Sequence, residues 1–301
     1  MLTDTEAMAA VAPSASLHRL HAPRADAVEI RVLGEVEAAG PCGAFAPGRA
    51  RPGALLAMLV IHAGECVPVD RLVEELWSAE SPARGAKRVQ VNVLRLRRGL
   101  AGVAPELDPG ALIRTGSHGY SLEIDPDSLD ATRFARLVAR GRSELDRGDP
   151  ARGAATLREA LALWRGRPYG GYAYESFAAP EIRRLEELRT WGLEAWAEAE
   201  LALGAHATMV PELQRLVTRH PLCERLHALL MIALYRCRRQ SEALAAYHRA
   251  RAVLVDGLGL EPGSELRALQ GAILDQCPSL ELGAGLAPVA TALARPLAQA
   301  A

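Results

Sequence analysis

The sequence lacks the patterns that mark several common classes of protein. Its five cysteines are an odd number without Cys-x-x-Cys spacing, which argues against a disulfide framework or a zinc site and favours reduced thiols. No run of about 18 apolar residues is present to span a membrane. Residues 1–26 have no apolar segment after a basic start, so they do not resemble a signal peptide. These absences predict a soluble cytoplasmic protein.

Motifs for catalysis and for ligand binding are missing as well. There is no Gly-x-x-x-x-Gly-Lys-Ser/Thr sequence and no strand-linked Gly-x-Gly-x-x-Gly sequence, so nucleotide hydrolysis has no support. Cys223 and His227 offer only two ligands at helical spacing, with His220 nearby, whereas a structural zinc needs about four. We expect no enzyme activity, no cofactor and no metal.

Net charge is also nearly absent, but the charges are unevenly distributed. The 35 basic and 36 acidic residues give a formal net charge of −1, and a neutral protein can still carry a basic binding face. From Arg84 to Arg98 there are six cations and no acidic residue, so ion pairs within this helical stretch cannot explain them.

The hydrophobic pattern predicts a mostly α protein with small β elements. In residues 27–125, a strand pattern at 28–32 precedes helices at about 49–62, 70–77 and 84–100, with Asp70 as an N-cap. Two strands at 111–115 and 120–124 then form a hairpin with glycines at its turn. This order is typical of a winged helix-turn-helix domain (α+β) with an N-terminal sheet.

Residues 130–277 predict an all-α tetratricopeptide-like domain. The turns at 203–207 and 237–241 lie 34 residues apart between helices, and an earlier copy at 147–151 fits if an insertion including residues 168–174 is allowed. Aromatic residues around this insertion favour packing between helical hairpins, with a ligand or partner groove as the alternative. We expect residues 1–26 and 280–301 to be disordered tails.

The basic helix divides into two faces. Val89, Val93, Leu96 and Leu100 recur at the spacing of a buried helical stripe. Arginines on the opposite face can pair with guanine, and Val91 can pack on a thymine methyl in the major groove. The predicted DNA-binding residues of this helix are Arg84, Lys87, Arg88, Val91, Asn92, Arg95, Arg97 and Arg98, of which Arg97 and Arg98 are better placed for phosphates. The predicted DNA contacts of the wing are Arg114, Thr115, Ser117 and His118.

Several stretches resemble a known family. Residues 70–77 (DRLVEELW), 89–98 (VQVNVLRLRR) and 113–122 resemble an OmpR-type winged helix, and residues 160–166 (ALALWRG), 220–227 (HPLCERLH) and 258–263 (LGLEPG) resemble the bacterial transcriptional activation domain. Over residues 27–277 the chain thus resembles the Streptomyces antibiotic regulatory proteins of the AfsR/DnrI/RedD type.

The resemblance implies a pathway-specific activator for a secondary-metabolite gene cluster. It would bind double-stranded DNA as a dimer at direct repeats near a −35 element, and it would contact RNA polymerase and its sigma factor. The loop after the second helix would take part in that contact, with Glu75, Trp77, Ser78 and Glu80 as candidates. We expect neither a receiver domain before the winged helix nor the ATPase and sensor modules of larger members.

Two alternatives remain at this point. The protein could be a DNA-binding repressor or ligand-responsive regulator that does not recruit polymerase. It could instead be a tetratricopeptide scaffold whose basic helix is incidental, since charged runs usually form solvated faces.

Overall fold

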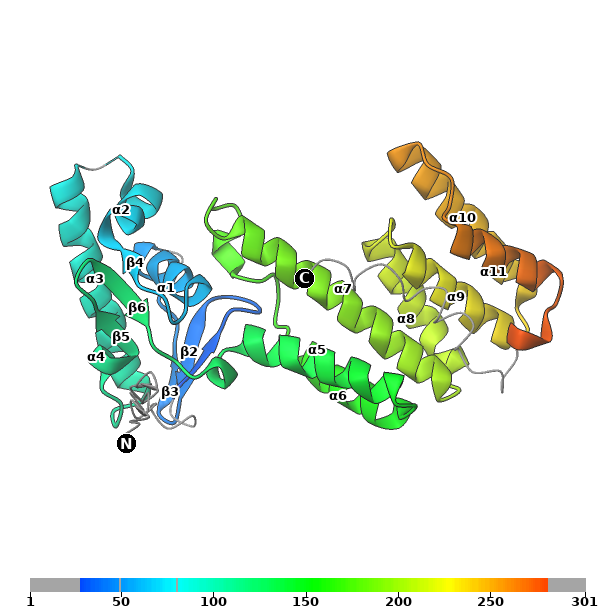
Figure 1. The fold of residues 1–301 in the computed structure, drawn as a ribbon, viewed down its shortest axis with the longest axis horizontal. Coiled ribbons are helices and arrows are strands. Elements are labelled where there is room, and N and C mark those ends of the chain that lie inside the picture. The colour runs from blue at the N-terminus through cyan, green and yellow to red at the C-terminus, as the bar shows by residue number, and fades with distance from the viewer. Residues whose placement is uncertain (1–27, 49, 80, 281–301) are drawn as a thin grey trace, which may run out of the picture.

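The computed structural model describes residues 28–48, 50–79 and 81–280. A small α/β unit lies at one end of the molecule and a row of paired helices extends away from it (Figure 1). The fold class predicted from the sequence, a winged helix-turn-helix followed by tetratricopeptide-like helices, is confirmed.

The chain begins with an antiparallel meander of three strands, β1 (Glu29–Arg31), β2 (Glu37–Gly40) and β3 (Gly43–Phe45). Ile30 pairs with Ala38, and both are fully buried. The side chains of Glu29 and Arg31 lie on the other face, because successive residues of a strand point to opposite sides. The alternation predicted at residues 28–32 is therefore a half-buried strand.

Four helices follow: α1 (Arg51–Ile61), α2 (Val69–Trp77), α3 (Pro82–Val103) and the short α4 (Pro109–Leu112). The prediction of Asp70 as an N-cap is wrong. The helix begins one residue earlier, so that Asp70 lies in the first turn and Pro68 is the capping residue without a side-chain hydrogen bond. An acidic residue still suits the first turn, where the helix dipole is positive.

The predicted hairpin is present as β5 (Ile113–Thr115) and β6 (Gly119–Leu122). Strand β4 (Val67–Pro68) pairs with the other edge of β6, so the sheet order is β4-β6-β5. Strand β5 is shorter than predicted, because Ala111 and Leu112 belong to α4. Asp108 caps that helix by accepting a 2.9 Å hydrogen bond from the amide of Gly110.

The remaining helices form three hairpins and a final helix. The elements are η1 (Pro126–Ser128), α5 (Asp130–Asp146), α6 (Pro150–Ala162), η2 (Gly170–Tyr172), α7 (Ala179–Ala202), α8 (His206–Arg219), α9 (Glu224–Arg236), α10 (Gln240–Leu258), α11 (Ser264–Leu274) and η3 (Pro278–Leu280).

The turns of the three hairpins confirm the predicted repeat. Gly148, Gly204 and Arg238 occupy equivalent positions after α5, α7 and α9, and all three have a positive φ, 79°, 83° and 61°. Glycine adopts this left-handed backbone without steric cost, whereas the arginine of the third turn carries a Cβ there. The same turn thus recurs with two different residue types.

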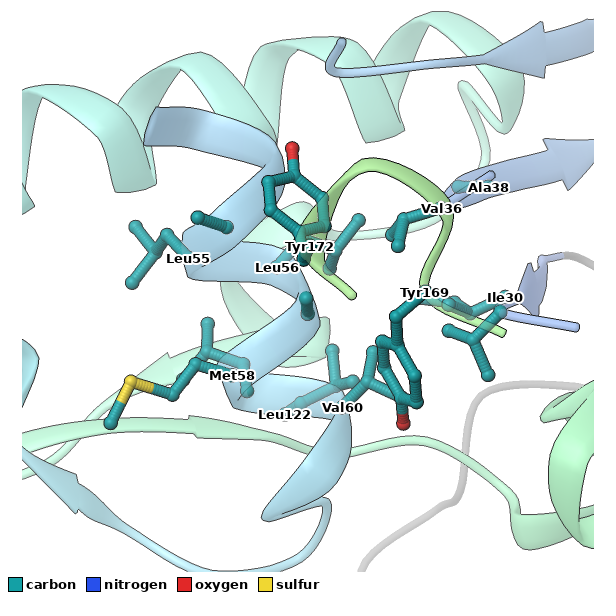
Figure 2. Packing of buried hydrophobic residues seen from close by; sticks show 14 of the residues in the cluster. Ile30, Val36, Ala38, Leu55, Leu56, Met58, Val60, Leu122, Tyr169 and Tyr172 are labelled. Carbon is teal, nitrogen blue, oxygen red and sulfur yellow. The ribbon is translucent and has the colours of Figure 1, made fainter. Parts of the chain in front are cut away.

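The aromatic residues around the insertion divide: Trp164 packs against Phe134 of α5, as predicted for the helical hairpins, but Tyr169 and Tyr172 pack against the winged-helix unit. Tyr169 and Tyr172 come from the connection between α6 and α7 and point toward α1 and the first sheet (Figure 2). The hydroxyl of Tyr172 donates a 2.5 Å hydrogen bond to the carbonyl of Gly48, and the amide of Tyr169 donates to the carbonyl of Val32. One hydrophobic core therefore extends from the winged helix into α5, α6 and the first half of α7.

Polar groups join the same two units. The buried carboxylate of Asp130, the first residue of α5, accepts hydrogen bonds from the amides of Val32 (2.8 Å) and Leu33 (3.0 Å). Burial raises the pKa of Asp130, and the two amides and Arg165 offset part of that effect. Arg165 also donates to Glu37 at 2.9 Å. The start of the helical domain is thus attached to the turn after β1.

A second core lies between α7 and α11 and extends to Leu280. The sequence placed residue 280 at the start of a disordered tail, but Leu280 is buried and its carbonyl accepts a hydrogen bond from Arg236 at 3.0 Å. The folded part therefore includes residue 280. The other residues of the two predicted tails lie outside the described residues. Val28, just after the predicted N-terminal tail, is already part of the hydrophobic core.

Candidate nucleic-acid interface

Helix α3 lies at the edge of the molecule farthest from α8–α11 (Figure 1). It begins at Pro82, which suits the first turn of a helix, where the proline ring has the right φ and the missing N–H costs nothing. The predicted stripe of Val89, Val93, Leu96 and Leu100 is buried to 1% exposure or less. Its apolar face is thus held in the core, and the other face is presented outward.

Two glycines allow the helix to lie close to its neighbours. A Cβ on Gly85 would come within 2.4 Å of Val73 in α2, and a Cβ on Gly99 would come within 2.2 Å of the ring of Phe45 in β3. These distances are far below van der Waals contact, so any side chain at either position would displace the helix. The position of α3 therefore depends on glycine at both ends of its buried face.

The outward face combines cations with apolar groups. A shallow hollow of about 480 Å³ is lined by Arg84, Lys87, Arg88, Val91, Asn92 and Arg95. Val91 and Leu94 are 44% and 48% exposed. A face that only contacts water has no use for exposed valine and leucine, whereas a major groove offers thymine methyl groups for them to contact.

Four cations of this face have no acidic partner among the described residues. In the part of the chain that the structure describes, no carboxylate oxygen lies within 4.0 Å of Arg84, Lys87, Arg95 or Arg98. Elsewhere arginines are commonly paired, as Arg133 is with Glu159 at 3.1 Å. Uncompensated charge on one helix face is what phosphate binding requires.

Asn92 departs from the prediction that it faces the DNA. Its side chain is 6% exposed, and its amide nitrogen donates a 2.8 Å hydrogen bond to the carbonyl of Arg88. Its Oδ1 is buried and has no hydrogen-bond partner among the described residues. In this conformation Asn92 borders the hollow but does not extend toward a base edge.

Arg97 also differs from its predicted role as a phosphate contact. Its Nε donates to the carbonyl of Ile113 at 3.1 Å, and its Nη2 donates to the hydroxyl of Thr115 at 2.9 Å. Both acceptors are in β5. Arg97 therefore joins α3 to the wing, and it occupies the Thr115 hydroxyl that the sequence assigned to DNA.

The rest of the predicted wing is exposed. Arg114, Ser117 and His118 lie on β5 and on the turn before β6. The carbonyl of His118 accepts a 2.9 Å hydrogen bond from the amide of Val69. The turn is therefore attached to the start of α2, while its side chains remain accessible.

The sequence pattern assigned no role to Gln90, which is exposed on α3. A glutamine amide can pair with the N6 and N7 atoms of adenine. Its place in the helix, one residue after buried Val89 and three after Lys87, was a signal that it faces outward. Gln90 carries no charge, however, so it adds nothing to the cationic pattern that marked the other residues.

The candidates for polymerase contact are placed differently from one another. Trp77 is buried, and Glu75 accepts a 3.2 Å hydrogen bond from Ser176 in the helical domain. Ser78, the C-cap of α2, is exposed. Glu80 lies outside the described residues. Of the three candidates that the structure describes, only Ser78 is exposed.

The suggested metal ligands have other partners. His227 lies 2.9 Å from the carbonyl of Pro221 through Nε2, and the thiol of Cys223 donates to Glu194 at 3.0 Å. Across residues 28–48, 50–79 and 81–280, no three His, Cys, Asp or Glu side chains gather as metal ligands would. Within the same ranges, no helix has the length and apolar character needed to cross a membrane.

Two family models match the chain in the order of its domains. "Transcriptional regulatory protein, C terminal" matches residues 48–122. "Bacterial transcriptional activator domain" matches residues 129–274. The first match contains α3 and the wing, and the second contains α5–α11 up to Leu274.

Known proteins resemble the chain over most of its length. Regulatory protein DnrI of Streptomyces peucetius is 36% identical over 270 residues, covering 89% of this chain and 99% of DnrI. Transcriptional regulator RedD of Streptomyces coelicolor is 37% identical, covering 86% of this chain and 74% of RedD. Regulatory protein AfsR of S. coelicolor is 38% identical over 90% of this chain, but the match covers 26% of AfsR.

A solved structure agrees with these relatives. The structure of Mycobacterium tuberculosis EmbR in complex with a low-affinity phosphopeptide superposes with a TM-score of 0.81 and 32% identity, covering 89% of this chain and 69% of EmbR. The chain therefore belongs to the Streptomyces antibiotic regulatory protein family and is a DNA-binding transcriptional regulator, not an enzyme.

Proposed function

We propose that this protein is a pathway-specific activator of a secondary-metabolite gene cluster, and that α3 occupies the major groove of its operator. The observation that carries the proposal is the outward face of α3, where Arg84, Lys87, Arg95 and Arg98 have no carboxylate within 4.0 Å among the described residues. Val91 and Leu94 are exposed between them. Arg88, which lines the same hollow, and Gln90 complete the proposed base-contacting set.

Phosphate contacts would fix the orientation of the helix. Arg98 lies toward the C-terminal end of α3, and Arg114, Ser117 and His118 are exposed on the wing behind it. Contacts to the backbone position a protein, whereas contacts to base edges supply its specificity. We assign Arg114, Ser117, His118 and Arg98 to the backbone, and Arg97 and Thr115 to holding the wing against α3.

We further propose that two copies bind a direct repeat in the same orientation and recruit RNA polymerase with its sigma factor near a −35 element. Copies on a direct repeat are related by translation along the DNA, so they contact each other through different surfaces. Half-sites about one helical turn apart, roughly 10 bp, place both α3 helices on one side of the duplex. Exposed Ser78, next to α3, is the proposed polymerase contact of the loop.

A footprint on the promoters flanking the gene tests the DNA part of this proposal. We expect protection of two similarly oriented half-sites, with weaker binding as the salt concentration rises. Absence of any sequence-specific protection would contradict it and leave the helical domain as an interaction scaffold.

Transcription in vitro with purified polymerase holoenzyme tests the activation part. We expect more transcript from the footprinted promoter when the protein is added. A decrease in transcript at the same protein concentrations would show a repressor that uses the same DNA-binding face.

A further inference from the structure

A second basic surface lies in the helical domain, where the end of α6 meets α7 and α8. Its centre is a stacked pair in which the guanidinium of Arg189 lies 4.4 Å from the centre of the Trp164 ring. Trp164 is itself fixed by an edge-to-face contact with Phe134, at 5.3 Å between ring centres. The arginine is therefore held in one orientation by the hydrophobic core.

Polar atoms of this pair are buried without partners. Arg189 Nε and Trp164 Nε1 have no hydrogen-bond acceptor within the described part of the chain. Buried donors are nearly always satisfied in native proteins, and an unsatisfied one calls for a bound water, ion or partner group. Both atoms are shielded from solvent, whereas the outer guanidinium nitrogens of Arg189 are neither buried nor hydrogen-bonded to the described residues, so these nitrogens are the ones that a partner can reach.

The charge of this surface is also uncompensated. Burial and the nearby charges of Arg219 and Arg215 lower the pKa of Arg189, and burial followed by the charges of Arg189 and Arg219 lowers the pKa of His220. Arg215 is neutralised by Glu212, which accepts from its Nε at 3.0 Å. Arg189 and Arg219 have no carboxylate within 4.0 Å among the described residues, and the nearby Glu186 pairs with Arg167 at 3.7 Å.

We propose that Arg189, Arg219 and Trp164 form a docking site for the carboxylate side chains of an acidic segment in a partner protein. A guanidinium stacked on an aromatic ring keeps its N–H edge free and fixed, which suits the two oxygens of a carboxylate. The aromatic surface beside it suits the side chains that flank such acids in a peptide. The carboxylates would pair with Arg219 and with the outer guanidinium nitrogens of Arg189, and they would remove the like-charge repulsion between the two arginines.

An acidic protein segment fits this surface better than DNA does. The basic surface lies on α7 and α8 in the helical domain, whereas α3 lies on the side of the winged-helix unit that faces away from these helices (Figure 1). The proposal goes beyond DNA recognition, and its test does not depend on the operator or on activation. Its failure would therefore leave the proposed function untouched.

The test measures the binding of a fluorescein-labelled synthetic peptide, rich in aspartate and glutamate and containing leucines, to the full chain by fluorescence anisotropy. We expect R219E to weaken binding at least about tenfold, as does the loss of a charge-assisted hydrogen bond. R189Q should have a similar effect. R183Q, at an exposed arginine of the same helix that makes no ion pair with the described residues, is the matched control and should bind as the wild type does.

Further arms distinguish a docking site from a purely structural role of the stacked pair. The peptide with asparagine and glutamine in place of its acids should not bind. Unchanged far-ultraviolet circular dichroism and thermal unfolding in R219E show that lost binding is not lost folding, because the exposed side chain of Arg219 makes no hydrogen bond to the described residues. If only R189Q loses binding and also unfolds early, the stacked pair serves the core alone and the proposal is wrong.

Three other results would also overturn the proposal. Equal affinity of wild type and R219E for the acidic peptide would show that the two arginines do not bind it. Competition by free citrate at concentrations far below those of the peptide would assign the surface to a small acid. An equal loss of affinity for promoter DNA in R219E would assign it to the DNA backbone.

Discussion

At the scale of the residue, the arginines of α3 divide by what they contact. Arg95 and Arg98 have no acidic partner in the described structure and face outward, whereas Arg97 donates to the carbonyl of Ile113 and the hydroxyl of Thr115. Similar residues on one helix thus serve different purposes. A contact with a ligand adds nothing to stability when the protein is free, but a contact within the fold contributes to it.

We predict that Arg97→Ala lowers the free energy of unfolding by about 1.5–3 kcal/mol, the range for hydrogen bonds to charged groups. Chemical denaturation measures this change. Arg98→Ala is the matched control, and its free energy of unfolding should stay within about 0.5 kcal/mol of the wild type. The same variant should reduce the slope of the logarithm of DNA affinity against the logarithm of salt concentration by about one. Equal stability of the two variants would contradict the role given to Arg97.

His206 predicts a pH dependence of stability. The side chain is buried at the start of α8, its ring nitrogens have no hydrogen-bond partner among the described residues, and burial followed by Arg236 lowers its pKa. The unfolded chain therefore binds a proton at this histidine at higher pH than the folded chain does. The stability that neutral His206 contributes to the fold is complete above the pKa of histidine in the unfolded chain, about 6.5. It is lost as pH falls through the lower pKa of His206 in the folded chain.

We predict that His206→Leu makes the free energy of unfolding less dependent on pH between neutrality and mild acid. Denaturant titrations across this range measure the slope, with His248→Leu, at an exposed histidine, as the control. His220 and His227, whose pKa values burial also lowers, should retain the remaining slope. An unchanged slope in His206→Leu would show that this histidine titrates alike in both states.

At the scale of the element, the position of α3 is set by close contact with α2 and β3. Gly85 lies against Val73 and Gly99 lies against Phe45, in both cases closer than a Cβ permits. The buried stripe of α3 was predictable because its valines and leucines recur with the period of the helix. The glycine contacts were not, because they depend on which elements meet in space.

We predict that Gly85→Ala destabilises the protein by about 1–3 kcal/mol through overpacking and weakens DNA binding by displacing α3. The control is Gly102→Ala in the same helix, where an added Cβ meets nothing within 4 Å. That substitution should stabilise by about 0.5–1 kcal/mol, since alanine favours a helix more than glycine does. Thermal unfolding measures both, and the same sign for both would refute the close contact inferred for Gly85.

At the scale of the whole molecule, the hydrophobic cores do not follow the boundary between the two matched families. The first core extends from β1 to Leu185 in α7, and the second extends from Leu193 to Leu280. Tyr169 and Tyr172 fill the contact between the winged helix and the first hairpin (Figure 2). The DNA-binding unit and the start of the helical domain therefore share one hydrophobic core, and we expect them to unfold together.

We predict that Tyr169→Ala lowers the free energy of unfolding by about 3–5 kcal/mol, as expected for a buried aromatic side chain. Calorimetry should show that the winged helix and the first hairpin no longer unfold in a single transition. Tyr174→Ala, at a side chain 92% exposed, should change little. A small effect of Tyr169→Ala would mean that the two units fold independently.

The sequence predicted elements better than it predicted contacts between them. Periodicity located α3 and the hairpin because local spacing determines which residues of an element are buried. It wrongly assigned Arg97 to phosphate, because the reach of an arginine to β5 is not a local property. It also wrongly assigned Tyr169 and Tyr172 to the helical repeats, because their approach to α1 and to the first sheet depends on the tertiary fold. Trp77 was misplaced for the same reason, since its burial depends on tertiary packing.

The outward face of α3 is proposed to determine which DNA sequence the whole molecule binds. The most direct measurement is the ratio of affinities for the footprinted site and for a scrambled duplex, at one salt concentration, in the wild type, Arg95→Ala and the distant control Arg183→Ala. We predict that Arg95→Ala lowers the free-energy difference between binding to the two duplexes by about 1–3 kcal/mol. Arg183→Ala should leave the ratio of affinities unchanged. An unaltered ratio in Arg95→Ala, with affinity for both duplexes reduced alike, would show that this arginine contacts only phosphate and would contradict the proposal.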